Sequence, residues 1–206
     1  MLHSGTETIT TPRLILRRFV PEDCDGILKN WCSDCEIQHE YGEPVYTTPE
    51  AAKGLLRKYI SGYAEKSYYR WAVIEGKSGE NIGMTAFCRV YDDIRTAEIE
   101  YCIGKKYWGN GYAGEALSAV INYAFSTADF AKLEAYHRAE NAKSGRVLAK
   151  SAMHLTDNVE RFRREGIIPE GEICYCIERK DIRTCSHRVN VRIFRHNSVG
   201  DKAKIR

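Results

Sequence analysis

The spacing of hydrophobic residues along the chain predicts alternating segments of strand and helix. Apolar residues at every second position predict strands over 8–19, 69–75, 81–91, 96–103, 132–138 and 172–178. Apolar residues three and four positions apart predict helices over 21–32, 48–63, 142–150 and after the glycines near residue 111. The segment 37–48, with its Gly and Pro, is predicted to be a loop. Antiparallel strands followed by helix, strand, helix and strand indicate a mixed α+β fold, not a doubly wound parallel sheet.

A glycine-rich turn separates the fourth of these strands from the helix that follows it. Gly109, Gly111 and Gly114 lie between the alternating residues 99–103 and a helical pattern that includes Leu117. A helix that starts at glycines presents unpaired backbone N–H groups and the positive end of its dipole, which suits a phosphate or pyrophosphate. The alternative is an ordinary turn. The segment is not a Walker loop, and a Rossmann fingerprint would follow the first strand of a βαβ series.

Residues 108–113, Trp-Gly-Asn-Gly-Tyr-Ala, resemble the pyrophosphate loop of the GNAT N-acetyltransferases, with Trp108 in the first position as in the RimJ/RimL-type branch. The resemblance covers about residues 9–178. It implies a mostly antiparallel sheet, splayed between its fourth and fifth strands and flanked by helices. Three further segments resemble this branch in the same order, namely 11–18, 97–104 and 140–150, the last with its Asn-x-x-Ser helix start.

This resemblance implies acetyl-CoA as the co-substrate. Its pantetheine arm is expected to add to the open edge of the fourth strand, as an extended peptide adds to a sheet. Its pyrophosphate is expected at the backbone N–H groups of the glycine-rich turn. The residues carried over are Gly109, Asn110, Gly111, Tyr112, Ala113 and Gly114 for the pyrophosphate, Tyr101, Cys102 and Ile103 for the thioester end, Asn141 for the arm, and Arg146 for the 3′-phosphate.

Acetyl transfer to an amine requires that a proton leave the amine and that the departing thiolate be stabilised or protonated. Ser144 is the candidate proton donor or water-positioning residue; the alternative is that it caps or packs its helix. Many family members have a tyrosine on this helix, where the nearest aligned residue here is Leu148. Glu100 is the candidate general base, acting through a water, and the alternative is a surface carboxylate. His137 and Glu140 are weaker candidates, since an isolated His is usually structural or solvated.

The composition excludes several other classes of protein. The chain has 206 residues, of which 43% are hydrophobic and 29% charged, as in a globular domain. No apolar run approaches the roughly 18 residues that span a bilayer, and the first residues lack signal-peptide features, so we expect a cytoplasmic protein without a membrane partner. We expect no metal, because Cys32 and Cys35 form a single C-x-x-C pair without a second pair at zinc-site spacing. The eight cysteines are expected to be reduced.

Positive charge is concentrated at the C-terminus. Residues 180–206 contain eight Lys or Arg and two Asp, a charge of +6, whereas residues 1–179 contain 23 Lys or Arg and 26 Asp or Glu, a charge of −3. We therefore divide the chain into an acetyltransferase-like domain, 1–179, and a basic extension, 180–206. The extension alternates like a strand over 188–194 but lacks an RNA-binding signature, so a solvated segment is favoured over a nucleic-acid contact.

The acceptor groove is expected at the loop 33–48 and the ends of the first two helices. This loop contains Asp34, Glu36, Glu40 and Glu43 and no Lys or Arg. An acidic rim would raise the local concentration of a cationic acceptor, and the alternative is a solvated loop of incidental acidity.

The leading prediction is an acetyl-CoA-dependent N-acetyltransferase that is a monomer or homodimer. Its acceptor is a primary amine, either a small molecule or a peptide N-terminus. The alternative is a catalytically inactive GNAT-like protein that senses acyl-CoA or binds RNA. A dinucleotide-dependent oxidoreductase is disfavoured, because no acidic residue follows at a strand end at the distance needed for a ribose.

Overall fold

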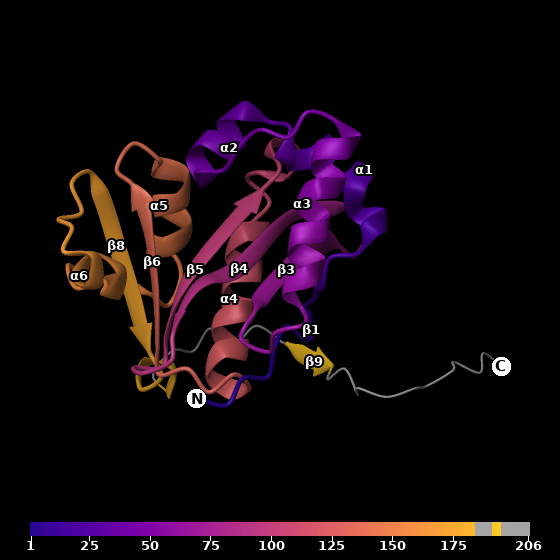
Figure 1. Cartoon of the computed structure of the whole chain (residues 1–206). Coiled ribbons are helices and arrows are strands. Elements are labelled where there is room, and N and C mark those ends of the chain that lie inside the picture. Colours follow the sequence, from indigo (N-terminus) through magenta and orange to yellow (C-terminus); the bar gives the residue numbers. More distant parts are fainter. Residues whose placement is uncertain (184–190, 195–206) are drawn as a thin grey trace.

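The computed structural model describes residues 1–183 and 191–194, and the statements below concern these residues. Their nine strands form one sheet in the order β7-β8-β6-β5-β4-β3-β2-β1-β9 (Figure 1). Neighbouring strands are antiparallel except for β5 and β6. The strands are β1 (Thr8–Thr10), β2 (Leu14–Arg17), β3 (Tyr69–Glu75), β4 (Asn81–Tyr91), β5 (Thr96–Ile103), β6 (Lys132–Arg138), β7 (His154–Leu155), β8 (Glu172–Glu178) and β9 (Arg192–Phe194).

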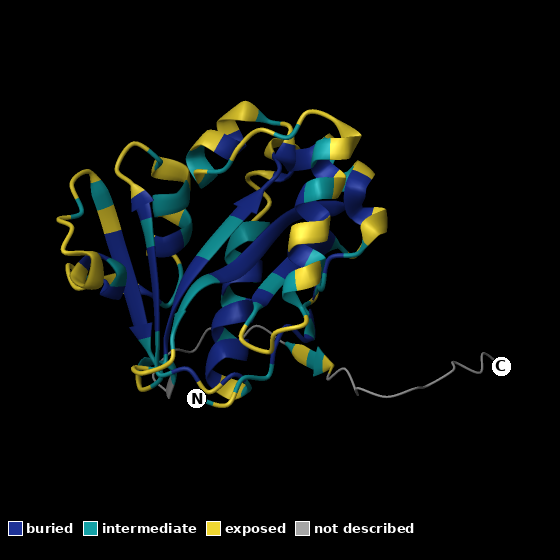
Figure 2. Ribbon diagram, viewed as in Figure 1, coloured by how far each residue is buried: buried dark blue, intermediate teal, exposed yellow. Residues whose placement is uncertain are grey.

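Helices cover both faces of the sheet and bury most of its residues (Figure 2). Helices α1 and α3 pack on one face and α4 on the other, whereas α2 and α5 lie at one end of the sheet (Figure 1). Helix α6 packs beside β6 and β8. The helices are α1 (Cys24–Ile27), continued by a π-helical turn (Leu28–Cys32), α2 (Cys35–Tyr41), α3 (Pro49–Gly62), α4 (Tyr112–Ser126), α5 (Ala142–Ala149) and α6 (Glu160–Glu165).

The two faces of the sheet have separate hydrophobic cores. The larger core lies against α4 and includes Trp71, and the smaller lies against α1 and α3 and includes Trp31. In β5, Tyr101 packs against the larger core and Cys102 belongs to the smaller one. Because successive side chains of a strand point to opposite faces, Glu100 lies on the face opposite to Tyr101.

Strands β5 and β6 separate after their first residues. Their parallel pairing joins Thr96–Glu98 to Lys132–Glu134, whereas β5 pairs with β4 over nearly its whole length. The edge of β5 from Ile99 to Ile103 therefore has no strand beside it, and the sheet opens as a V with α2 and α5 at its mouth (Figure 1). The predicted α+β fold, splayed between the fourth and fifth strands of the sequence analysis, is confirmed.

The first predicted strand is a hairpin, so the prediction of one strand over 8–19 is wrong. Ile9 pairs with Leu16 across the turn. The N–H of Thr11 donates to the carbonyl of Leu14 at 2.9 Å and closes this turn around Pro12. Ile9 is five positions before Leu14, so the alternation changes phase at the turn, a signal that the sequence analysis overlooked.

Helix α2 occupies Cys35–Tyr41, so the predicted loop over 37–48 is wrong for residues 37–41 and confirmed for residues 42–48. The carboxylate of Asp34 accepts hydrogen bonds from the N–H groups of Glu36 and Ile37 at the helix start. Gly42 ends the helix with a φ of 76°, a conformation that favours glycine. Asp before the helix and Gly after it are the two signals that could have predicted α2.

The C-terminal segment contributes the edge strand β9, which pairs with β1 through Ile9 and Ile193. Residues 188–190 of the predicted alternating run lie outside the described residues. The division of the chain at residue 179 remains a prediction. None of the helices within the described ranges combines the length and apolar character needed to cross a membrane.

Candidate active site

A cleft of about 880 Å³ occupies the opening between β5 and β6. Of the site residues that the sequence analysis names, Asn110 and the weaker candidate Glu140 do not line it, and the others do. The side-chain amide of Asn110 instead donates to the carbonyls of Tyr107 and Trp108, each at 3.2 Å. The predicted residues that the cleft brings together are Glu100, Tyr101, Cys102, Ile103, Gly109, Gly111, Tyr112, Ala113, Gly114, Asn141, Ser144 and Arg146.

The start of α4 presents backbone N–H groups to this cleft. Gly111 is the residue before the helix, with a φ of 78°, and no side chain caps the helix there. The N–H groups of Tyr112, Ala113 and Gly114 belong to the first turn, so no helical carbonyl accepts from them. A Cβ built at Gly109 meets no atom within 4 Å. Free donors, a positive helix end and open space together fit a pyrophosphate.

Arg13, in the turn between β1 and β2, forms hydrogen bonds with the glycine-rich turn and with the first turn of α4. Its Nε donates to Oε2 of Glu115 at 2.6 Å, and its Nη1 donates to the carbonyl of Asn110 at 2.8 Å. Its guanidinium carbon lies 4.8 Å from the centre of the Tyr112 ring. These contacts hold the start of α4 against the sheet, a role that no local pattern around Arg13 indicates.

Ser144 meets Tyr101 across the opening of the sheet. The two hydroxyl oxygens are 2.8 Å apart. Asn141, and not Ser144, caps α5, because its Oδ1 accepts from the N–H of Ser144 at 3.0 Å. Burial raises the pKa of Tyr101 to about 12, so its phenol stays protonated and can donate. Leu148 is fully buried in the core, and the sequence analysis placed Tyr101 near the thioester without recognising its hydroxyl as a donor.

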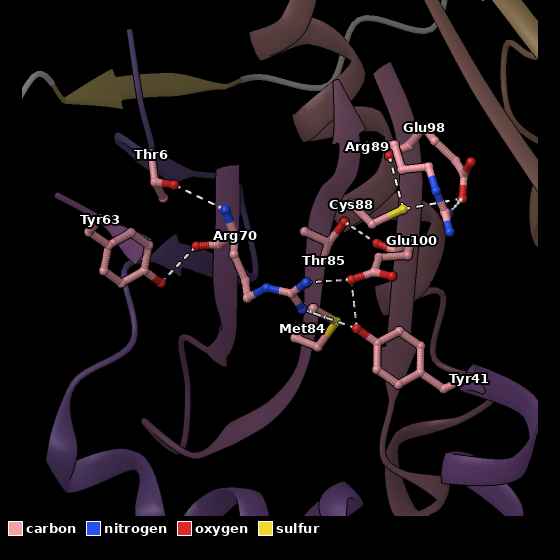
Figure 3. A network of polar contacts seen from close by, with 10 residues as sticks. All are labelled: Thr6, Tyr41, Tyr63, Arg70, Met84, Thr85, Cys88, Arg89, Glu98 and Glu100. Atoms are coloured by element: carbon pink, nitrogen blue, oxygen red, sulfur yellow. Dashed lines mark hydrogen bonds and ion pairs between the residues drawn. The ribbon is translucent and has the colours of Figure 1, made fainter. Parts of the chain in front are cut away.

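Glu100 lies on the other face of β5, where two side chains hold one of its oxygens (Figure 3). Nη2 of Arg70 and the hydroxyl of Tyr41 each donate to Oε1 at 2.7 Å. Nη1 of Arg70 also donates to the Tyr41 hydroxyl at 3.0 Å. Burial and the charge of Glu100 raise the pKa of Tyr41 well above its usual range, so Tyr41 is a neutral donor. Glu100 thus lines the cleft as a tethered, half-buried carboxylate. Tyr41 and Arg70 were missed by the sequence analysis.

Glu98 lies two residues before Glu100 and is more deeply buried. Its side chain is 4% exposed, and Oε1 accepts from Nη1 of Arg89 at 2.8 Å. Burial raises the pKa of Glu98. Its Oε2 is enclosed and has no partner within the described part of the chain. Glu98 lines the cleft like Glu100, but its side chain is much less exposed, 4% against 24%.

His137 also borders the cleft, from β6. Its Nδ1 lies 2.7 Å from the carbonyl of Arg138, and its ring packs on α5 where Gly145 leaves room, since a Cβ there would approach the ring within 2.8 Å. Its Nε2 is buried without a partner among the described residues. Glu140 is exposed and does not line the cleft.

Helix α2 links the two arms of the V by charged contacts. Glu36 accepts from Lys143 of α5 at 2.6 Å and pairs with Lys105 at 2.8 Å, and these hydrogen bonds lower its pKa to about 2. Asp34 pairs with the same Lys105 at 3.0 Å. Two of the four acidic residues of the predicted rim are therefore neutralised by lysines from elsewhere. Glu40 and Glu43 line the cleft.

No cluster of three or more His, Cys, Asp or Glu side chains in the described ranges could hold a metal ion. The candidate site combines three features. They are the backbone donors at the start of α4, the hydroxyl pair of Tyr101 and Ser144 on one face of β5, and the hydrogen-bonded carboxylate of Glu100 on the other face.

Comparison with known proteins identifies relatives of the chain in sequence and in fold. Residues 13–154 match the family model described as acetyltransferase (GNAT) domain. The chain is 30% identical over 160 residues to the uncharacterized N-acetyltransferase YoaA of Bacillus subtilis (strain 168), covering 78% of this chain and 85% of that protein. It is 23% identical over 169 residues to the ribosomal protein uS5-alanine N-acetyltransferase of Escherichia coli (strain K12), covering 80% and 84%. The crystal structure of the ribosomal-protein-S5-alanine acetyltransferase from Vibrio fischeri shares the fold, with a TM-score of 0.69 at 17% identity, covering 84% of this chain and 97% of that one.

Proposed function

Because the chain belongs to the GNAT acetyltransferases and is an N-acetyltransferase, we propose that it transfers the acetyl group of acetyl-CoA to a primary amine on a peptide N-terminus or a small cation. The observation that carries this proposal is the placement of Ser144 and Glu100. They approach the unpaired edge of β5 from its two faces. A thioester at that edge would have hydroxyl donors on one face and a proton acceptor on the other.

The donor half of the cleft fits acetyl-CoA. The N–H groups at the start of α4 are suited to the pyrophosphate, and the open edge of β5 from Ile99 to Ile103 is suited to the amides of the pantetheine arm. Asn141 and Arg146 line the same cleft and are the candidates for the rest of the arm and the 3′-phosphate.

When bound, acetyl-CoA supplies a thioester carbonyl carbon that bonds to the amine nitrogen while the C–S bond breaks, giving an N-acetylamine and a thiolate, which then takes a proton from solvent. Glu100 accepts the proton that the amine loses, directly or through a water. The other carboxylate oxygen of Glu100, Oε2, is available to accept this proton, because both side chains that donate to the carboxylate donate to Oε1. The Tyr101 and Ser144 hydroxyls stabilise the departing sulfur. A phenol whose pKa is about 12 is a weaker acid than a thiol of pKa about 8.5, so we assign them hydrogen bonding to the thiolate, not complete proton transfer.

The acceptor half of the cleft supports a cationic amine. Glu40 and Glu43 line it, and Oε2 of Glu40 is buried without a partner in the described part of the chain. The relatives named for the alanine of a ribosomal protein support a protein N-terminus as the acceptor class.

A screen of acceptors tests the proposed activity. With acetyl-CoA, we expect thiol release in the presence of peptides with free N-termini, polyamines or aminoglycosides, and none with N-terminally blocked peptides that lack lysine. The rate at low acceptor concentration should fall several-fold between about 50 and 500 mM salt, because salt screens the attraction of Glu40 and Glu43 for a cation. Glu43→Gln should weaken this salt dependence. Transfer to an anionic acceptor without salt dependence would contradict the acidic-rim assignment, and no transfer to any amine would favour the acyl-CoA-sensing alternative.

Substitution of Glu100 tests the base. We expect Glu100→Gln to lower kcat/KM for the acceptor about 10²- to 10⁴-fold at pH values where the amine is protonated. The loss should shrink as the pH rises, because a neutral amine no longer needs a base before it attacks. The affinity for acetyl-CoA, measured by calorimetry, should stay unchanged. A loss of equal size across the whole pH range would instead assign Glu100 a structural role.

A further inference from the structure

A single row of residues across three strands connects Arg70 to Glu100. Arg70 of β3 is the register partner of Ala86 in β4, and Ala86 is the register partner of Glu100 in β5. Ala86 is 1% exposed and has only a methyl group. The Arg70 side chain therefore extends over Ala86 and reaches the carboxylate two strands away (Figure 3). A larger residue at position 86 would block this path.

Arg70 is mostly buried, and both of its terminal nitrogens donate hydrogen bonds. Its side chain is 12% exposed, and its guanidinium carbon lies 4.4 Å from the centre of the Tyr59 ring. Burial acts to lower the pKa of Arg70, but Tyr41 and Glu100 raise it overall, so Arg70 remains a cation. A buried ion pair commonly adds little net stability, because desolvation offsets the attraction. Stability alone is therefore a weak explanation for an arginine that spans the sheet to meet a carboxylate in the cleft.

We propose that Arg70 and Tyr41 are positioning residues, which fix Oε1 of Glu100 and direct Oε2 toward the acceptor amine. This inference rests on the proposed function of Glu100 as the base. The guanidinium at Nη2 and the hydroxyl of Tyr41 both donate to Oε1, so together they restrict the rotation of the carboxylate. Oε2 is thereby held in one orientation at the edge of the cleft.

The other titratable groups around Glu100 leave Arg70 as its counter-charge. Burial raises the pKa of Tyr59, Tyr68, Cys88 and Cys102, so these side chains are neutral at physiological pH. The remaining charged groups near this face are Glu98 with its partner Arg89, and Glu40 and Glu43 along the cleft. Arg70 is thus the cation in direct contact with Glu100.

Steady-state kinetics of Arg70→Gln test this proposal in the full chain, with acetyl-CoA and an amine that the wild type acetylates. Without the guanidinium, Oε1 of Glu100 loses one of its two donors and the carboxylate can rotate away from the amine. We expect kcat to fall about 10- to 100-fold, while KM for acetyl-CoA stays unchanged. Arg70→Lys should restore most of the lost turnover. In a Glu100→Gln background, Arg70→Gln should produce no further loss, because the coupled partner is gone.

Two further variants keep the test decisive. Tyr41→Phe removes one hydroxyl from a surface helix, and we expect kcat to fall about 3- to 10-fold with an unchanged melting temperature. If Arg70→Gln fails to fold, the kcat of Tyr41→Phe tests the proposal in its place. Arg89→Gln removes the guanidinium from Glu98 and should lower kcat much less than Arg70→Gln does. Wild-type turnover in Arg70→Gln, or full turnover in Tyr41→Phe, would overturn the proposal. Absence of acetyl transfer by the wild type would instead reject the function on which it rests.

Discussion

Gly111→Asp is expected to weaken the binding of acetyl-CoA about 100- to 1000-fold. Gly111 precedes α4 with a φ of 78° and lines the cleft, so an aspartate there would place a carboxylate beside the expected pyrophosphate. Two like charges about 4 Å apart repel by roughly 4 kcal/mol at an effective dielectric constant near 20, which is about a thousandfold in affinity. Nη2 of Arg13 lies 3.5 Å from where the new Cβ would be and would offset part of this repulsion. Calorimetry measures the affinity.

Two control variants separate charge from backbone strain. Gly111→Ala introduces the strain of a left-handed residue, about 1–2 kcal/mol, without the charge, so its affinity should fall clearly less. Gly166→Asp places the same residue at a φ of 65° at the end of α6, with open space around its Cβ and away from the cleft, so its affinity should be that of the wild type. An unchanged affinity of Gly111→Asp for acetyl-CoA would contradict the assignment of this turn to the pyrophosphate.

Ser144→Ala is expected to lower kcat about 10- to 1000-fold, with little change in acetyl-CoA affinity. The serine hydroxyl lies 2.8 Å from that of Tyr101 and is assigned to the departing sulfur, where charge develops only as the C–S bond breaks. A donor used in that way lowers the barrier without strengthening ground-state binding. Steady-state kinetics for the reaction and calorimetry for acetyl-CoA measure the two effects separately.

A double variant tests whether the hydroxyls of Tyr101 and Ser144 act together. Tyr101→Phe should lower kcat by a similar factor, and the double variant should lose less than the product of the two single losses, because residues that act as a unit are not additive. Ser61→Ala, which removes a hydroxyl bonded within α3, is the matched control and should leave turnover unchanged. Normal turnover in Ser144→Ala would return this serine to a structural role in α5.

Local patterns in the sequence predicted most of the framework. The alternation over 69–75, 81–91 and 96–103 became β3, β4 and β5 with nearly the same bounds. The two failures lie in short elements, where periodicity is a weak signal. At the hairpin, only the change of phase between Ile9 and Leu14 marks the turn. In the short polar helix α2, the signals are the cap at Asp34 and the glycine at 42.

The donor half of the site could be predicted for the same reason. The glycines at 109 and 111 and the start of α4 are contiguous, so their spacing alone indicates a row of free N–H groups. The family resemblance, now confirmed by the match over residues 13–154, predicts that this row is an acyl-CoA loop. Hydrogen bonds between residues distant in sequence have no such local signature.

The sequence by itself therefore determined the order of elements, the splayed α+β fold and the backbone cradle at α4. Only the tertiary structure decided which side chains complete the site. Ser144 meets Tyr101 because the splay lets α5 approach β5 from one face, and Arg70 reaches Glu100 on the other face because the residue between them in the sheet is alanine. These partners are separated by 43 and 30 residues in the chain. Their meeting depends on strand order and register, which arise from packing the whole sheet and not from any local spacing.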